Sequence, residues 1–398
     1  MMLSLILSLS LVLCEVSASV PTPLDVLGRA IPYYLSQMND SALLKVNQYG
    51  PAIALAATFD ASVLFGERDW AVIASNLIDA YAADTSSLAY AVLHNITVDP
   101  GYSVGDELGL MPLSYVARAL AEGVAYNSNN SDWMLALRVV NEYVIPWKRT
   151  LSDGTITRDV GSWSPKEPDV NASFLWSDDQ FMGTALLCRL AGTAGFPPVA
   201  AAHLAEWALA QQLGFASRQQ RAASGLFSHG YNAATGDNSC CAWGRANGWV
   251  MMAHAAVVSL AAKVVPHSVR LPLVVSVWQR QAQALLALQD TASGLWHQVL
   301  DDPTTFLETS ASAMFIQSMA DGSRGGWLNR SAVTGAVTAG WAGVASTVTL
   351  NGSITGICEG TGIGVNEAFY QARKTDYADA APGIGAVFRA ALAVATPF

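Results

Sequence analysis

Apolar residues recur along much of the chain at intervals of three and four positions, the spacing of helices with one buried face. The clearest apolar stripe comprises Val274, Trp278, Ala282, Leu285 and Leu288, with Gln279, Arg280 and Gln283 opposite and Pro272 at its start. A second stripe, Leu137, Val140 and Val144, ends at Pro146. Similar spacing predicts helices over 108–122, 179–192, 199–213, 246–263, 310–320, 331–346, 365–374 and 383–395. The only candidate strands are short, such as 295–300. The chain is therefore predicted to be all-α.

Three short loops point to an internal repeat. Gly154, Gly225 and Gly294 each sit in a polar-Gly-x-apolar pattern, 71 and then 69 residues apart. Each interval has room for two helices and a loop, and stacked helix pairs can close into a ring. Chance similarity of three short loops is the alternative. We prefer an all-helical toroid to an open solenoid and expect the pocket at its mouth, where the loops converge.

The N-terminus has the features of a secretory signal peptide. Residues 3–13 are apolar, too few to span a bilayer, and the small residues Ser17, Ala18 and Ser19 follow. We predict a signal peptide over 1–19 and a single domain over 20–398, with a buried first helix as the alternative. The other long apolar stretch, 249–262, is interrupted by His254 and Ser259 and is predicted to be a core helix.

Composition agrees with an exported, folded protein. Hydrophobic residues make up 52% of the 398 residues and charged residues 13%, which excludes a disordered chain. A net charge of −10 argues against nucleic acid and anionic membranes as partners. Six Asn-x-Ser/Thr sequons suit a secreted glycoprotein; they begin at Asn39, Asn95, Asn129, Asn171, Asn329 and Asn351. We expect an extracellular protein that acts as a monomer.

Four cysteines remain once Cys14 has left with the signal peptide. An oxidising compartment permits up to two bridges among Cys188, Cys240, Cys241 and Cys358. Bridging the adjacent Cys240 and Cys241 strains the backbone, so we expect one of them to pair with Cys358. The sequence has neither HExxH nor CxxC, and we expect no metal and no cofactor.

The first candidate for chemistry is the segment Trp176-Ser177-Asp178-Asp179-Gln180-Phe181-Met182-Gly183. A carboxyl group beside an indole can be desolvated, which raises its pKa and suits it to general acid work. The competing interpretation is a capping box of Ser177 and Gln180, with two acids in the first helical turn. A helix N-terminus favours the carboxylate, so a proton donor there needs strong burial.

The second candidate is His229 together with Trp243-Gly244-Arg245-Ala246-Asn247-Gly248-Trp249. Arginine offers a planar fork that matches a carboxylate, and tryptophan faces stack on sugar rings. Alternatively the tryptophans belong to the core and Arg245 pairs with a structural acid.

Weaker candidates follow the same logic. Asp106 precedes a predicted helix, which capping also explains. His297 can reach a pocket, whereas Glu308 and Ser310 also fit a helix start. Gly360-Thr361-Gly362-Ile363-Gly364 lacks the strand and spacing of a dinucleotide site, and the absence of GxSxG disfavours that class of serine hydrolase.

Together these blocks resemble glycoside hydrolase family 105, the unsaturated rhamnogalacturonyl hydrolases, which is related to the unsaturated glucuronyl hydrolases of family 88. The resemblance runs from about residue 100 to the C-terminus. It rests on five motifs: the 176–182 and 243–249 blocks, Gly294-Leu295-Trp296-His297-Gln298, Glu308-Thr309-Ser310-Ala311-Ser312-Ala313-Met314-Phe315 and Gly360-Thr361-Gly362-x-Gly364.

The resemblance implies a six-hairpin (α/α)6 barrel. It also implies removal of a 4-deoxy-4,5-unsaturated uronic acid from the non-reducing end of pectic fragments left by polysaccharide lyases. Asp178 would be the general acid/base, and Arg245 and His229 would bind the uronate. Trp176, Trp243 and Trp249 would shape the sugar site, and Asp106 matches a second acid.

The chain departs from that family in the loop before the catalytic block. It has Ile156-Thr157-Arg158-Asp159 where many members have an aromatic-His-Lys step, and a longer stretch, 161–174, which holds the Asn171 sequon. Two other functions stay open: a glycosidase of similar fold, such as an endo-mannanase that uses Asp178 and Asp179 on saturated glycans, and a secreted carbohydrate-binding protein without turnover.

Overall fold

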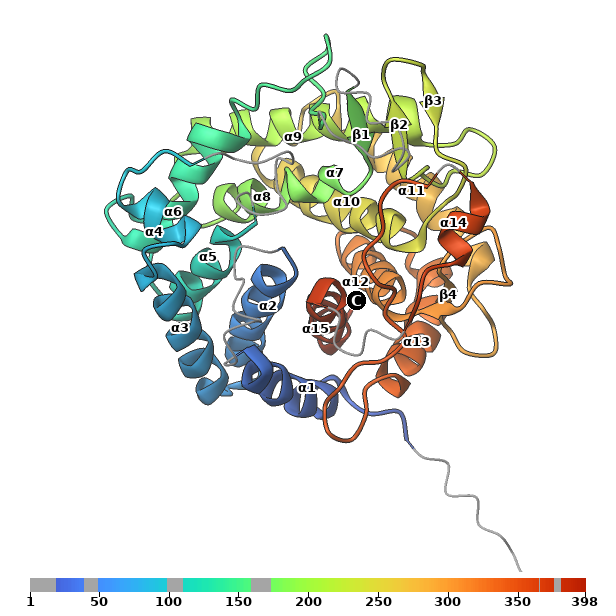
Figure 1. The fold of residues 1–398 in the computed structure, drawn as a ribbon, viewed down its shortest axis with the longest axis horizontal. Coiled ribbons are helices and arrows are strands. Elements are labelled where there is room, and N and C mark those ends of the chain that lie inside the picture. The colour runs from blue at the N-terminus through green and yellow to red at the C-terminus, as the bar shows by residue number, and fades with distance from the viewer. Residues whose placement is uncertain (1–18, 39–48, 99–109, 159–172, 365, 376–380) are drawn as a thin grey trace, which may run out of the picture.

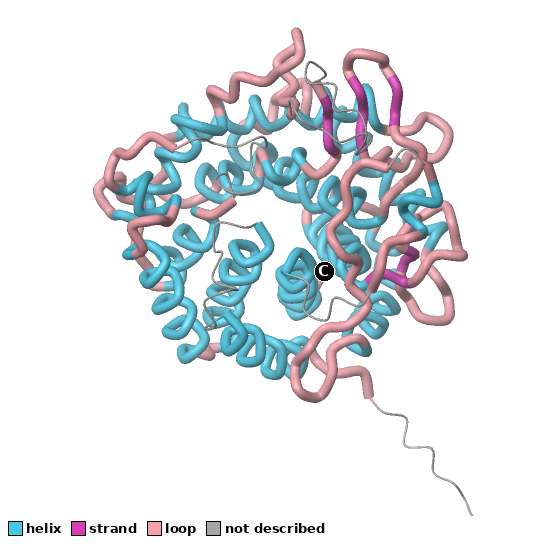
Figure 2. The backbone as a smooth tube through the Cα atoms, in the orientation of Figure 1, coloured by secondary structure: helices cyan, strands magenta, loops and turns pink. Residues whose placement is uncertain are grey.

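Helices arranged as a double ring make up the body of the molecule (Figures 1 and 2). The computed structural model describes residues 19–38, 49–98, 110–158, 173–364, 366–375 and 381–398. Within these residues the inner ring consists of α2 (Tyr49–Phe65), α5 (Pro112–Ala121), α7 with α8 (Asp179–Met182 and Ala185–Ala191), α10 (Gly244–Val264), α12 (Thr309–Arg324) and α15 (Ala381–Ala395). Each packs on the next, and α15 packs on α2, so the C-terminal helix closes the ring.

A second helix covers each inner helix from outside. The outer partners are α1 (Pro23–Met38) on α15, α3 (Arg68–Ala83) on α2, α6 (Ser131–Val139) with the π-helical η1 (Val140–Val144) on α5, α9 (Pro198–Gln219) on α8, α11 (Leu271–Leu288) on α10 and α13 (Arg330–Ser346) on α12. The described residues thus form six helix pairs, and the predicted all-α toroid is confirmed. Two short helices, α4 (Leu88–Leu93) and α14 (Glu367–Gln371), lie outside this scheme.

The outer helix α11 shows how the apolar stripe drives this packing. Val274, Trp278, Ala282 and Leu285 are buried, whereas Gln279 and Arg280 are exposed, as the spacing predicts. The inner helix α10 is buried on nearly all sides, which confirms the core helix expected over 249–262. Among the described residues no helix is both long and apolar enough to cross a membrane.

The repeated glycine loops take up equivalent backbone positions. Gly154, Gly225 and Gly294 all have positive φ, at 82°, 79° and 75°, and each lies in a tight turn after an outer helix. A fourth such turn contains Gly352, at φ 95°, which the sequence pattern missed. At Gly294 a Cβ atom would lie 2.2 Å from the Ala339 carbonyl oxygen, so packing as well as backbone conformation requires glycine.

Short strands line one end of the ring. β1 (Phe174–Trp176), β2 (Gly230–Asn232) and β3 (Asp237–Asn238) form one antiparallel sheet, and β4 (Trp296–His297) pairs with β5 (Leu307–Glu308). Trp176 lies opposite Gly230 in the β1–β2 register. The first sheet therefore brings the Trp176 block and the His229 loop together at the mouth.

The cysteines differ from our expectation. Cys240 is bonded to Cys241, and Cys188 and Cys358 are free and buried. The predicted bridge to Cys358 is wrong: Cys241 lies in the same buried cluster but its sulfur is bonded to Cys240, and the Cys358 thiol lies 3.8 Å from Gln298 Nε2. Burial raises the pKa of the Cys358 thiol to about 11, so it stays protonated near neutral pH.

Candidate active site

The turn between β1 and α7 presents Asp178 at the mouth of the ring. Asp178 is 9% exposed, and its Oδ2 faces His229 Nε2 at 3.5 Å. Neither of these two atoms has a normal hydrogen bond to the described residues. Buried polar atoms are nearly always satisfied, so an unsatisfied pair at a mouth marks a place for a ligand or water.

Two side chains hold the His229 loop beside Asp178. The Ser177 hydroxyl donates to the Ser228 carbonyl at 2.6 Å, and the Ser177 N–H donates to the His229 carbonyl at 3.0 Å. On the other side the Asn247 amide accepts from the Phe227 N–H and donates to the Phe227 carbonyl. The competing interpretation, a capping box of Ser177 and Gln180, is wrong: Ser177 ties two loops together, and α7 has no side-chain cap.

Tyr370 sets the state of the His229 ring. Its hydroxyl lies 2.9 Å from His229 Nδ1 and accepts from the Gly364 N–H at 3.0 Å. With that acceptor position filled, the hydroxyl proton is free to point at Nδ1, which leaves the ring proton of a neutral His229 on Nε2, toward Asp178. Burial raises the pKa of Tyr370 to about 12, so it remains a proton donor.

The two adjacent acids have separate partners. Asp179 is fully buried and makes a bidentate pair with Arg158, through Nε to Oδ2 at 2.8 Å and Nη2 to Oδ1 at 2.7 Å. The same guanidinium lies 4.4 Å from the centre of the Trp176 ring. Asp179 is thus a structural acid. Arg158, which lies in the segment that departs from the resembled family, packs its guanidinium over the Trp176 ring.

Opposing effects act on the Asp178 carboxyl group. Burial alone would raise its pKa, but contact with the His229 imidazole and the charge of Arg158 outweigh burial and hold the pKa below its usual value. The unliganded protein therefore carries Asp178 as a carboxylate at neutral pH. A negatively charged ligand placed beside it would push the pKa back up.

Comparison with known proteins identifies the family of this chain. The model of Glycosyl Hydrolase Family 88 matches residues 124–395. The chain belongs to glycosyl hydrolase family 88. A segment of 71 residues is 44% identical to the unsaturated rhamnogalacturonyl hydrolase YesR of Bacillus subtilis strain 168, covering 18% of this chain and 20% of that protein. The match thus spans about a fifth of YesR. Protein Atu3128 of Agrobacterium fabrum strain C58 is 30% identical over 195 residues, 42% of this chain and 81% of that one.

Solved structures show the family 88 fold over nearly the whole chain. A family 105 glycoside hydrolase of C. acetobutylicum ATCC 824 has a TM-score of 0.73 at 18% identity, covering 92% of this chain and 99% of its own. The unsaturated glucuronyl hydrolase of Bacillus sp. GL1 has a TM-score of 0.59 at 14% identity, covering 93% and 96%. The resemblance to families 105 and 88 is confirmed.

In this family 88 chain Arg245 serves the fold. Its guanidinium is 1% exposed and donates to the carbonyls of Cys358 at 2.6 Å and Glu359 at 2.8 Å. It lies 3.8 Å from Glu308 Oε1, so the alternative of a structural acid as partner describes these contacts better than an open fork does. Arg245 anchors the loop that leads to Tyr370, and direct uronate binding by Arg245 is not favoured by these contacts.

The three predicted tryptophans differ in access. Trp176 is partly exposed and has an indole N–H without an acceptor among the described residues. Trp243 is 2% exposed and lies between His229 and Arg245, and Trp249 is 1% exposed and stacks on Phe181. Of the three, Trp176 is the one placed to touch a sugar, and the other two support the site from the core.

The remaining candidate residues are either held in structural contacts or lie outside the described residues. Glu308 accepts from the Ala311 N–H and the Ser310 hydroxyl, which confirms its helix-start interpretation. His297 Nδ1 lies 2.6 Å from the Thr305 carbonyl oxygen within the β4–β5 hairpin. Asp106 and Asn171 lie outside the described residues.

Tyr370 and Arg158 were missed by reasoning from the sequence. Arg158 lies in the segment that departs from the resembled family, and its place 21 residues before Asp179 carries no local signal. Tyr370 is 141 residues from His229. The one hint near Tyr370 in the sequence is the glycine cluster at 360–364, which lacks the strand and spacing of a dinucleotide site.

Proposed function

We propose that this family 88 protein is an unsaturated uronyl hydrolase. It would remove a 4-deoxy-4,5-unsaturated uronic acid from the non-reducing end of lyase-generated oligosaccharides. Asp178 would protonate C4 of the vinyl ether and then accept a proton from the water that adds at C5. The resulting hemiketal would open and expel the remaining sugar.

The observation that carries this proposal is the Asp178 carboxyl group, which lies beside the His229 imidazole. Hydration of a vinyl ether needs one group that acts as acid and then as base, and Asp178 Oδ2 lies 3.5 Å from His229 Nε2 with 12% of its side chain exposed. The substrate's own carboxylate would raise the pKa of Asp178, which supplies the protonated form that the free protein lacks.

The geometry disfavours a saturated-glycan hydrolase that uses Asp178 and Asp179. Such enzymes need two carboxyl groups that flank the bond, about 5–10 Å apart, and both must reach the substrate. Asp179 is 1% exposed and committed to Arg158. Protonating or redirecting Asp179 would break a buried ion pair, which costs about 3–5 kcal/mol.

A pectic substrate and export complete the proposal. The similarity to YesR supports rhamnogalacturonan fragments. Export is supported by the apolar run over 3–13 and by the sequon asparagines within the described residues, all exposed: Asn95, Asn129, Asn329 and Asn351. The signal peptide over 1–19, the domain over 20–398 and the monomeric state stay predictions.

The direct test follows the ultraviolet absorbance of the conjugated ene-carboxylate. Purified protein would be given unsaturated disaccharides from a rhamnogalacturonan lyase and, separately, from a glucuronan lyase. We expect absorbance to fall as a free sugar appears, fastest on the rhamnogalacturonan product. Flat absorbance on both from folded protein would reject the reaction, and cleavage of saturated glycans would favour the classical glycosidase.

The Asp178→Asn variant tests the residue. General acid–base catalysis contributes about 10²–10⁴-fold, so kcat should fall by about that factor. Asp237→Asn, which changes an exposed acid on the neighbouring strand β3, is the matched control and should keep its rate. A rate for Asp178→Asn near that of the control would remove Asp178 from the mechanism. Sugar affinity with no turnover in the unaltered protein would identify the carbohydrate-binding alternative.

A further inference from the structure

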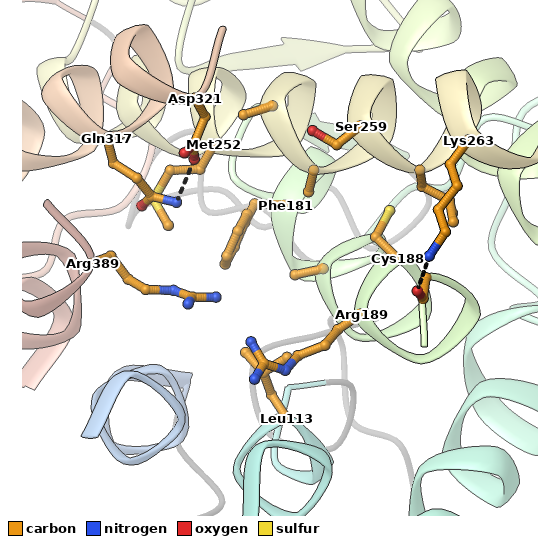
Figure 3. A pocket seen from close by; sticks show the side chains of 15 residues that line it. Leu113, Phe181, Cys188, Arg189, Met252, Ser259, Lys263, Gln317, Asp321 and Arg389 are labelled. Carbon is orange, nitrogen blue, oxygen red and sulfur yellow. Dashed lines mark hydrogen bonds between the residues drawn. The ribbon is translucent and has the colours of Figure 1, made fainter. Parts of the chain in front are cut away.

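A cavity of about 430 Å³ lies inside the ring, apart from the Asp178 mouth (Figure 3). Its walls come from α5, α8, α10, α12 and α15, and Phe181 of α7 is the part of the catalytic turn that reaches it. Asp178 and His229 are not among its lining residues. The cavity is therefore a separate compartment that shares one wall with the proposed active site.

Two arginines that line this cavity lie close together. Figure 3 shows the Arg189 guanidinium, from α8, and the Arg389 guanidinium, from α15, extending toward each other. Both bind one carboxylate, Asp60 of α2: Arg189 donates to Oδ1 and Oδ2 at 2.5 and 2.9 Å, and Arg389 donates to Oδ2 at 2.7 Å. Two positive charges thus share one negative charge.

The other charged groups around the cavity do not neutralise the excess positive charge of Arg189 and Arg389. Asp321 also lines it but forms an ion pair with Arg324 and accepts from Gln317. Lys263 sits at the edge, where its ammonium group donates to the Gly192 carbonyl at 2.7 Å. The described charges here, three arginines and a lysine against two aspartates, sum to +2.

Unused hydrogen-bond donors lie on the same two arginines. The Nε atoms of Arg189 and Arg389 are buried and have no acceptor among the described residues. Arg389 uses one nitrogen, Nη1, for Asp60. Burial lowers the pKa of Arg389, the attraction of Asp60 opposes that shift, and the like charge of Arg189 adds to it. Asp60 alone therefore leaves these two guanidinium groups short of both acceptors and negative charge.

We propose that this cavity binds a small oxyanion of the size of phosphate between Arg189 and Arg389. Guanidinium forks match the oxygen spacing of phosphate and carboxylate groups, and the cavity has room for either. The bound anion would accept from the unused donors and join α8 to α15, the helix that closes the ring on α2. A purely structural Arg–Asp–Arg cluster is the alternative, and it predicts no specific response to anions.

The test measures thermal unfolding and calorimetric binding of the full chain with inorganic phosphate, against sodium chloride of equal ionic strength. We expect Tm to rise with phosphate and to saturate, and chloride to have no such effect. Arg389→Gln should weaken phosphate binding at least tenfold. Arg189→Lys, which keeps a charge but loses the fork, should weaken it less and serves if the first variant does not fold.

The sharpest arm is Asp60→Asn, which removes the carboxylate that competes with the anion. It should unfold at a lower temperature without phosphate and gain more from phosphate than the unaltered protein, with affinity raised at least tenfold. Asp132→Asn is the matched control, because Asp132 pairs with Arg118 at the α5–α6 junction, away from the cavity. Its response to phosphate should equal that of the unaltered protein.

Two outcomes would overturn the proposal: equal Tm in phosphate and chloride, or Asp60→Asn with no greater phosphate response than Asp132→Asn. Galacturonate in place of phosphate identifies the source of the anion. A lower Kd for galacturonate, lost in Arg389→Gln, would assign the same site to a sugar carboxylate, and a lower Kd for phosphate would assign it to inorganic phosphate.

Discussion

At the scale of single residues, the site depends on the chain of contacts from Asp178 through His229 to Tyr370. Asp178 Oδ2 lies 3.5 Å from His229 Nε2, and His229 Nδ1 lies 2.9 Å from the Tyr370 hydroxyl oxygen. Asp178 touches the reacting atoms in the proposed reaction, whereas Tyr370 acts through His229 and is a positioning residue. The two kinds of role predict different kinetics.

Tyr370→Phe should lower kcat by about 3- to 10-fold, the effect of one lost hydrogen bond, with KM little changed. The imidazole would lose the hydroxyl that fixes its tautomer, so the pH profile should shift as well. Tyr231→Phe, on strand β2 directly after the His229 loop, is the control for removal of a hydroxyl. A Tyr370→Phe profile that superimposes on the unaltered one, at equal kcat, would refute the positioning role.

The pH dependence of kcat/KM follows from the lowered pKa of Asp178. Because His229 stabilises the carboxylate, the protonated form needed for C4 is lost as pH rises through that low pKa. Activity on unsaturated disaccharides should therefore decline from the acid side toward neutral pH. His229→Gln removes the imidazole contact that lowers the pKa of Asp178 but not the burial, so this pKa rises and the remaining activity should decline at higher pH. A shift to lower pH in this variant would contradict the assignment.

At the scale of elements, the loops at the mouth depend on buried side-chain clamps. Asn247 of α10 satisfies both backbone groups of Phe227, and Gly244 and Gly248 let α10 approach its neighbours closely. A Cβ at Gly248 would lie 2.5 Å from the Met314 sulfur on α12. The Trp-Gly-Arg-x-Asn-Gly-Trp block thus builds the wall that holds His229, and its members need not touch substrate.

Asn247→Ala should destabilise the fold and lower activity together. It leaves the Phe227 N–H and carbonyl buried without partners, at about 1–3 kcal/mol for each group. Chemical denaturation and the absorbance assay would measure both effects. Asn238→Ala removes an exposed amide that donates to the Arg218 carbonyl, and it should change neither by much. Full stability in Asn247→Ala would mean that the loop is held by other contacts.

The sequence predicts elements well where one face is buried and poorly elsewhere. α11 follows its apolar stripe, but α2 is buried over nearly every residue from Gly50 to Ala57 and has no periodicity to detect. Strands of two or three residues carry too little pattern to be found. Asp178 was found because it lies in a distinctive block, and the role expected of His229 came from the family resemblance. The Arg158–Asp179 contact was not found because it depends on the isolated backbone pairing of Arg158 with Phe174, which has no sequence pattern. The Tyr370–His229 contact was not found because it joins residues 141 positions apart.

At the scale of the whole molecule, the two ends of the chain meet. α15 packs between α2 and α12 and is covered by α1, and the Trp341 indole donates to the Pro21 carbonyl at 3.1 Å. The first and last helix pairs therefore complete the ring through packing and through the ion pairs of Asp60 with Arg189 and Arg389. In the described residues no disulfide joins these ends.

This arrangement predicts how the protein responds to reductant. A bridge from Cys241 to Cys358 would close a loop of more than 100 residues and contribute on the order of 4–5 kcal/mol. The observed Cys240–Cys241 bond joins neighbours and constrains the unfolded chain very little. Dithiothreitol should therefore leave Tm nearly unchanged, and the Cys240→Ser/Cys241→Ser double variant should match the reduced protein. A fall of several degrees on reduction, absent from that double variant, would show that a long-range bridge forms in solution and that Cys358 is not free. Peptide mapping of the non-reduced protein would then identify its partner, since a vicinal pair stays within one peptide and a bridge to Cys358 joins two.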